Sequence, residues 1–216
     1  LQSLNSIEHI GFPFRKNFHN RIRQYGGACN IWPGRTMVLS KSDISKRNWM
    51  PKSDWPISFG SLEKYYSKAT SYLGITNYKY FNYEEWSPKI TKVEKSIFDL
   101  GILDPSISLW AKKTKRFGIG SKDQKFIENN NNIKTYINST LCEIVMNEAQ
   151  KKINSLKIKT ANGKNLIFKS KVFIIACGGI ENARLLLLSS NQNRNGIGND
   201  TNNVGRYFME HPKIVK

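Results

Sequence analysis

The spacing of apolar residues along the chain changes near residue 130. Beyond four consecutive asparagines at 129–132, short stretches of alternating apolar and polar residues are separated by turn signals such as Asn162-Gly163. Alternation with a period of two is typical of strands that bury one face, and an Asn-Gly pair is a strong hairpin signal. The pattern predicts four short strands, at 133–138, 141–147, 153–160 and 166–169.

A run of apolar residues follows at 171–177. Such a run is typical of a strand that is buried on both faces. Gly178 and Gly179 come directly after it, and residues 180–188 then have the spacing of a helix. We therefore expect a buried strand, a tight glycine turn and a helix in succession, followed by an Asn- and Gly-rich loop at 191–205.

The first half of the chain carries weaker patterns. Residues 61–69 predict a helix, with Ser58 or Ser61 as its N-cap, and a second helix is expected around 89–100. Together with the later strands, these elements predict a mixed α/β or α+β fold. A length of 216 residues suits one domain or two small ones. We expect three regions, at 1–60, 61–130 and 131–216.

The charge of the chain raises the question of a nucleic-acid partner. It has 34 Lys and Arg against 16 Asp and Glu, a formal net charge of +18. However, Lys outnumbers Arg by 25 to 9 and Asn reaches 23, as expected from an AT-rich coding sequence. The basic residues are scattered, and no nucleic-acid-binding motif accompanies them. The charge does not favour nucleic acid, and a non-catalytic basic module that binds nucleic acid or an acidic surface stays the alternative.

Cysteine and histidine usage limits the compartment and the metal chemistry. Cys29, Cys142 and Cys177 are odd in number and far apart, which favours a reducing, cytoplasmic location. The three histidines have no ligand spacing, so no metal site is expected. The longest apolar runs are far shorter than the roughly 20 residues of a transmembrane helix, so no membrane span is expected either.

Two glycine-containing segments are candidate binding sites. The Gly178–Gly179 pair lies between the expected strand and helix, where free N–H groups of the helix suit a phosphate or the edge of a flavin. An ordinary packing turn explains the pair equally well. The segment 26–34 could lay amide groups against a planar anionic cofactor, or it could be a structural loop pinned by Trp32 and Pro33. Gly196-Ile-Gly198 does not follow an apolar strand, so we do not interpret it as a nucleotide-binding fingerprint.

Four motifs in order resemble the glucose–methanol–choline (GMC) oxidoreductase family, and its sugar- and polyol-oxidising, pyranose-oxidase-like bacterial branch in particular. Gly26-Gly-Ala-Cys-Asn-Ile-Trp-Pro-Gly-Arg35 is similar to a family loop Gly-Gly-x-x-Asn-x-Trp-x-Gly. The other three motifs are Trp49–Tyr66, with its Trp-Pro-Ile-Ser and Tyr-Tyr elements, Ala176–Leu187 and Val204–Pro212. Four motifs in the family's order are more specific than any one alone.

The resemblance implies an FAD enzyme that oxidises the CH–OH group of a small-molecule alcohol, sugar or polyol, with an electron acceptor that the sequence does not identify. It places the flavin and pyrophosphate against the 26–32 loop, the adenine near Leu141, and the adenosine side against the turn after residue 175. Some relatives attach FAD through a histidine where this chain has Ile31, so the FAD is expected to be non-covalent. The implied cofactor residues are Gly26, Gly27, Ala28, Asn30, Trp32, Leu141, Ala176, Cys177, Gly178, Glu181 and Asn182.

Two parts of the family pattern have no counterpart in residues 1–216. These are the N-terminal strand–G-x-G-x-x-G–helix unit and the segment with the catalytic histidine, so no catalytic residue is assigned. We therefore interpret the chain as the middle portion of a GMC enzyme that lacks the N-terminal Rossmann unit. Expressed alone, it is expected to bind no FAD and to be inactive.

Overall fold

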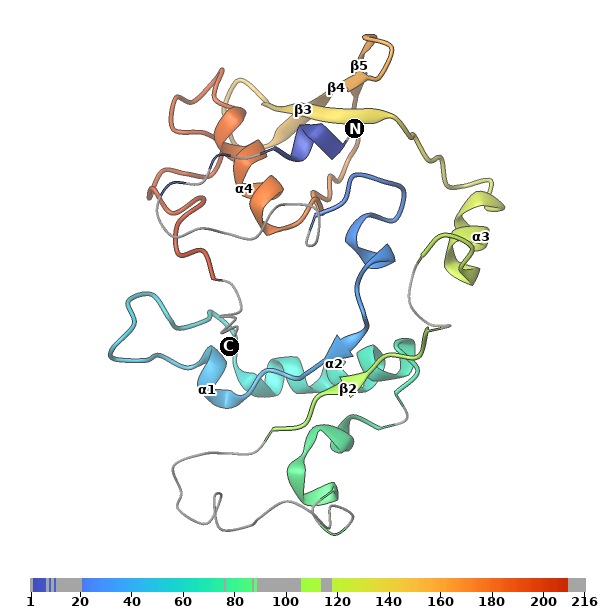
Figure 1. The fold of residues 1–216 in the computed structure, drawn as a ribbon. Coiled ribbons are helices and arrows are strands. Elements are labelled where there is room, and N and C mark those ends of the chain that lie inside the picture. The colour runs from blue at the N-terminus through green and yellow to red at the C-terminus, as the bar shows by residue number, and fades with distance from the viewer. Residues whose placement is uncertain are drawn as a thin grey trace. The chain divides into compact units, whose positions relative to one another are not determined.

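The computed structural model describes residues 2–6, 8, 10, 21–75, 77–86, 88, 106–113 and 118–209. Contacts between residues divide the chain into two compact units, Leu1–Thr135 and Tyr136–Lys216, which are described separately below. Both helices and strands are present (Figure 1), so the predicted mixed fold class is confirmed at that level. The finer division at residues 60 and 130 stays a prediction.

Three short helices in the first unit begin at serine caps. Helix α1 spans Lys41–Ile44, α2 spans Phe59–Tyr72 and α3 spans Lys122–Glu128. The Ser58 hydroxyl accepts a hydrogen bond of 3.2 Å from the Ser61 N–H, which satisfies one of the free donors at the start of α2. The helix predicted at 61–69 is therefore confirmed, with Ser58 as its cap. The helix expected at 89–100 lies outside the described residues.

The first unit also contains a minimal two-stranded ladder. Strand β1, Arg35–Thr36, pairs antiparallel with β2, Leu109–Trp110. The ladder continues past β2, because Ala111 donates its N–H to the Gly34 carbonyl at 2.8 Å. The described part of this unit also contains 3₁₀ turns at Gln2–Asn5, Gly27–Asn30, Tyr78–Phe81 and Tyr83–Glu85. Its buried apolar residues are Ile44, Ile75, Phe81 and Ala111.

The second unit is built on a three-stranded antiparallel sheet in the order β3–β4–β5 (Figure 1). The strands span Ser139–Met146, Ile153–Thr160 and Asn165–Phe168, so three of the four predicted strands are confirmed. The register places apolar pairs such as Leu141 and Ile158 opposite each other on one face. Polar and basic pairs such as Thr140 and Lys159 lie on the other. This alternation is typical of a sheet with one packed face.

Helix α4, Gly179–Leu188, packs against β3 and confirms the predicted helix (Figure 1). At its end the buried Ser189 hydroxyl donates to the Leu185 carbonyl and accepts from the Ile144 N–H, at 2.7 and 2.9 Å. The Gln192 side chain exchanges two hydrogen bonds with the Met146 backbone, at 2.7 and 3.0 Å. Side chains thus satisfy the backbone groups at the free edge of β3, where an open edge would invite pairing with another chain.

Two predicted strands are wrong. At 133–138 the chain is irregular, and Asn138 takes a left-handed φ of 51°, which interrupts the extended backbone immediately before β3. At 171–177 the chain is also irregular, and Val172 and Ile174 are 72% and 85% exposed. A strand needs a neighbour that pairs with its backbone, and no described strand lies beside these residues. The run is therefore not buried on both faces: Val172, Ile174 and the final Cys177 are exposed, while Phe173 and Ile175 are half-buried.

One carboxylate on the sheet makes the stability of this unit sensitive to pH. The Lys157 ammonium donates to Glu143 at 2.9 Å and the Asn191 amide donates at 2.7 Å, and together they hold the Glu143 pKa below its ordinary 4.5. A lowered carboxyl pKa stabilises the fold above the ordinary value, and this contribution is lost as the pH falls through the folded pKa.

We expect Glu143→Gln to lower the free energy of unfolding by up to about 1 kcal/mol near neutral pH, since Lys157 is half-exposed and water screens the pair. The difference from the wild-type chain should vanish at an acid pH below the folded pKa of Glu143, where the wild-type carboxyl is protonated. Hydrogen exchange of β3 and β4 amides measures it, with the exposed Glu148→Gln as a matched control. A difference that is equally large at both pH values would contradict the assignment.

Candidate functional site

The first candidate segment is a tight turn in the first unit. Gly26 and Gly27 take φ values of 81° and 49°, in the left-handed region that glycine adopts without strain, and the 3₁₀ turn Gly27–Asn30 follows. Backbone bonds close the turn, with Gly27 donating to Gln24 at 2.9 Å and Trp32 donating to Ala28 at 2.9 Å. The two glycines of this segment therefore lie in a compact turn.

The side chains of this segment differ in their exposure. Ala28 is exposed, and its N–H donates to no acceptor in the described part of the chain, whereas Trp32 is half-buried. A Cβ added at Gly27 would meet nothing within 4 Å. The turn thus presents an open backbone surface at Gly27 and Ala28, which a ligand can approach closely.

Asn30 is fully engaged in hydrogen bonds to the protein. Its amide nitrogen donates to the carbonyls of Tyr25 and Gly27 at 2.8 and 3.1 Å, and its amide oxygen accepts from the Ile119 N–H at 2.9 Å. Sequence reasoning placed Asn30 against the cofactor and missed its partner in the 118–120 turn. The only local signal for that turn is the pair Gly118 and Gly120 immediately before a serine cap.

The second candidate segment joins residues 175–177 to α4 in the second unit. Gly178 takes φ 89° and ψ 159°, a backbone conformation that is essentially restricted to glycine. The Asn182 amide oxygen accepts from the Cys177 N–H at 2.8 Å, and its nitrogen donates to the Ile175 carbonyl at 3.2 Å. One side chain therefore holds the segment before Gly178 against the first turn of the helix.

The N-terminus of α4 has the features of an anion site. Gly178 offers no side-chain cap, so the N–H groups of Gly179 and Ile180, at the start of this ten-residue helix, donate to no described acceptor. The Glu181 carboxylate would repel an anion there, but the guanidinium of Arg184 donates to Glu181 Oε2 at 2.7 and 3.0 Å and offsets the charge of this carboxylate. Added Cβ atoms at Gly178 and Gly179 would meet nothing within 4 Å, which leaves open space for a phosphate.

The structure groups the predicted residues by unit. Gly26, Gly27, Ala28, Asn30 and Trp32 form the turn in the first unit. Ala176, Cys177, Gly178, Glu181 and Asn182 form the second segment, and Leu141 is half-buried on β3 of the same unit. Gly196 has a different role, because a Cβ there would lie 2.7 Å from the Leu186 carbonyl oxygen. The absence of a side chain at Gly196 permits close packing against α4. This structural role agrees with the prediction that Gly196-Ile-Gly198 is not a nucleotide-binding fingerprint.

Comparison with known proteins identifies the family. Residues 112–213 match the family model of the GMC oxidoreductases, a range that contains the whole second candidate segment. Over this stretch, slightly less than half of its length, the chain has the sequence pattern of the GMC oxidoreductases. The resemblance to this family is thereby confirmed, and two of the four motifs, Ala176–Leu187 and Val204–Pro212, lie within the matched residues.

A curated protein is also similar to this chain over one stretch. The large subunit of fructose dehydrogenase from Gluconobacter japonicus is 37% identical over 68 residues. The aligned stretch covers 31% of this chain and 12% of the relative. The match therefore supports family membership over one stretch only. Among the described residues of this chain, no helix is both long and apolar enough to cross a membrane.

Proposed function

We propose that the protein to which this chain belongs is an FAD-dependent oxidoreductase that oxidises the CH–OH group of a sugar, a polyol or another alcohol. The observation that carries the proposal is the family match over 112–213, which contains the glycine turn and helix of the second candidate segment. The similarity to a protein named as a fructose dehydrogenase favours the sugar- and polyol-oxidising branch. Nothing in either comparison points to a nucleic-acid-binding module.

Each candidate segment, taken by itself, fits part of FAD. The N-terminus of α4 suits a phosphate, because the N–H groups of Gly179 and Ile180 carry partial positive charge and Gly178 leaves the approach open. The exposed Ala28 N–H beside Gly27 can donate to a polar edge of the flavin or to the pyrophosphate. Leu141 and the backbone of Ala176 and Cys177 would contact the adenosine.

The chemistry divides between the cofactor and the chain. FAD supplies an acceptor for the hydride that leaves the CH–OH carbon. The residues of this chain bind and orient: Gly178 and Asn182 set the turn before α4, and Gly26 and Gly27 shape the other turn. We assign none of the described side chains to the transfer of the hydroxyl proton.

The position of Ile31 predicts how FAD is held. Its side chain is 40% exposed next to the glycine turn and has no nucleophilic atom with which to form a bond to a flavin. The flavin should therefore be released when the purified protein is precipitated with acid, and it should appear in the supernatant. Flavin that stays with the precipitated protein would contradict non-covalent binding.

The substrate class can be tested by anaerobic reduction of the flavin. The protein should be produced from the complete reading frame that contains residues 1–216, and then mixed with D-fructose, other sugars, polyols and simple alcohols in turn. At least one CH–OH donor should bleach the visible flavin absorbance. Dithionite serves as the control that the flavin can be reduced. Bleaching by dithionite but by no CH–OH donor would contradict the proposed reaction.

A further inference from the structure

The hydrogen bonds of Asn30 are inconsistent with a role as a direct cofactor contact. Its amide nitrogen has two hydrogens, and the carbonyls of Tyr25 and Gly27 lie within 2.8 and 3.1 Å to accept both of them. Its oxygen accepts from Ile119, which is 89 residues away in the sequence. An amide that breaks these bonds to reach a ligand would leave two part-buried carbonyls and the exposed Ile119 N–H without this partner, which costs free energy, chiefly at the two carbonyls.

We propose that Asn30 is a positioning residue, which holds the glycine turn at 26–30 against the 118–120 turn so that the Gly27–Ala28 backbone is presented to the cofactor. This inference rests on the proposed function, and it replaces the direct contact that the family resemblance implies for Asn30. The cofactor is contacted by the backbone, and the side chain fixes where that backbone lies.

The 118–120 turn is itself held in place by hydrogen bonds to the start of α3. Ser121 donates its N–H to the Gly118 carbonyl at 3.0 Å, and its hydroxyl caps α3 by accepting from the Gln124 N–H at 3.1 Å. The Gln124 side chain in turn accepts from the Gly120 N–H. The turn and the start of α3 are thus one hydrogen-bonded piece.

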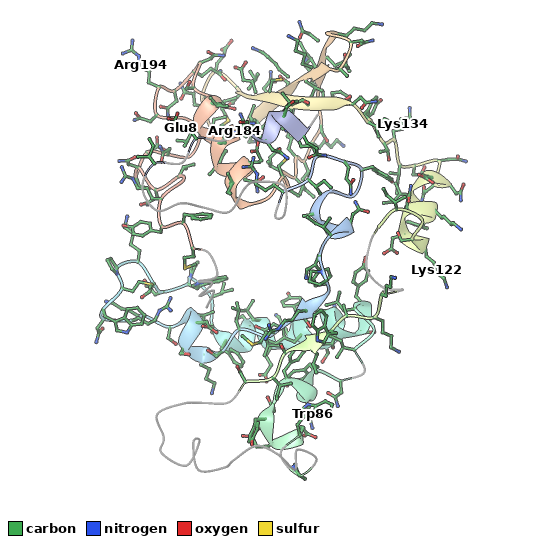
Figure 2. All side chains as sticks on the ribbon, viewed as in Figure 1. Glu8, Trp86, Lys122, Lys134, Arg184 and Arg194 are labelled. Atoms are coloured by element: carbon green, nitrogen blue, oxygen red, sulfur yellow. The ribbon has the colours of Figure 1, made fainter. Side chains whose placement is uncertain are left out.

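Helix α3 is in turn joined by a hydrogen bond to α2, in the same unit. The Tyr72 hydroxyl at the end of α2 donates to the Asp123 carboxylate at 3.1 Å. The exposed Lys122 begins α3 (Figure 2). Asn30 therefore connects the glycine turn to two helices, and among the described residues the Ile119 N–H···O bond is the hydrogen bond that makes this connection.

The test compares Asn30→Ala with Asn30→Asp and with the control Asn131→Ala, all in protein from the complete reading frame. Asn131 is exposed and its side chain makes no hydrogen bond with a described residue. Alanine removes all three bonds. Aspartate keeps the acceptor for Ile119 but loses the donors to Tyr25 and Gly27. It therefore separates the effect of the Ile119 bond, which bridges the two turns, from the effect of the two bonds within the glycine turn. It also provides a second variant in case Asn30→Ala does not fold.

Two readouts are needed, one of which does not involve FAD. Hydrogen exchange of the Ile119 amide in flavin-free protein should rise about tenfold or more in Asn30→Ala, and less in Asn30→Asp. The Kd for FAD, from titration of the flavin-free protein, should also rise about tenfold in Asn30→Ala. The Asn131→Ala protein should match the wild type in both measurements.

Other outcomes would overturn the inference in distinguishable ways. An unchanged Kd in Asn30→Ala would show that the bridge does not set the cofactor site. A raised Kd with unchanged Ile119 exchange would show that Asn30 contacts the cofactor directly. A wild-type protein that binds no FAD would contradict the proposed function itself and remove the cofactor role of Asn30, while the exchange data would still show whether the bridge forms.

Discussion

Replacing Gly196 by alanine is expected to destabilise the second unit by about 3 kcal/mol or more. The glycine is buried with a φ of 85°, and an added Cβ would lie 2.7 Å from the Leu186 carbonyl oxygen and 2.8 Å from the Leu187 Cα. Both atoms belong to the α4 backbone, so no flexible side chain can move aside. The next residue, Ile197, also donates its N–H to that Leu186 carbonyl at 2.9 Å, and this bond would be strained.

Gly198→Ala is the matched control for this prediction. Gly198 also has a positive φ, 67°, but nothing lies within 4 Å of the added Cβ, so only the backbone cost of roughly 1–2 kcal/mol applies. Hydrogen exchange of α4 and β3 amides is the suitable measurement. Tryptophan fluorescence is not, because all five tryptophans precede residue 136 and report on the first unit. Equal effects of the two substitutions would show that the close packing at Gly196 is absent.

Gly178→Ala should weaken FAD binding far more than Gly179→Ala. Nothing lies within 4 Å of an added Cβ at either position, so the two variants differ only in backbone conformation. Gly178, at φ 89° and ψ 159°, lies in a region that other residues enter at a cost of about 1–3 kcal/mol. Gly179 is the first residue of α4, where alanine is neutral or stabilising.

Alanine at position 178 is expected to relieve its strain by turning the chain, which moves Cys177 away from the Asn182 amide. The FAD Kd should rise roughly tenfold for each 1.4 kcal/mol of that cost, and exchange of the Cys177 amide should rise in flavin-free protein. Gly179→Ala should change neither quantity. If both variants bind FAD as the wild type does, the turn before α4 does not shape the cofactor site.

The sequence predicted the elements that local signals determine. The three confirmed strands alternate apolar and polar residues and include the Asn162-Gly163 turn, where Gly163 takes a φ of 84°. Helix α2 is marked by the cap at Ser58. In contrast, the apolar run at 171–177 forms a strand only if a neighbour pairs with it, and its composition alone does not supply that neighbour. The stretch 133–138 was predicted wrongly because the left-handed Asn138 separates it from β3.

For the candidate site, the sequence predicted which glycines matter but not how side chains support them. Gly26, Gly27 and Gly178 all have positive φ, as turns of this kind require. The bond from Ile119 to Asn30 joins residues 89 positions apart, and no pattern within either segment indicates it. The Asn182 amide likewise bonds to backbone groups that would pair with a neighbour if 171–177 formed a strand.

The central claim, that these glycine turns belong to an FAD site, is tested most directly by purifying the protein from its complete reading frame and recording its visible absorbance after incubation with FAD and gel filtration. We predict one tightly bound FAD per chain in the wild type and a reduced amount in Gly178→Ala. A complete, folded wild-type protein that elutes without flavin would contradict the account.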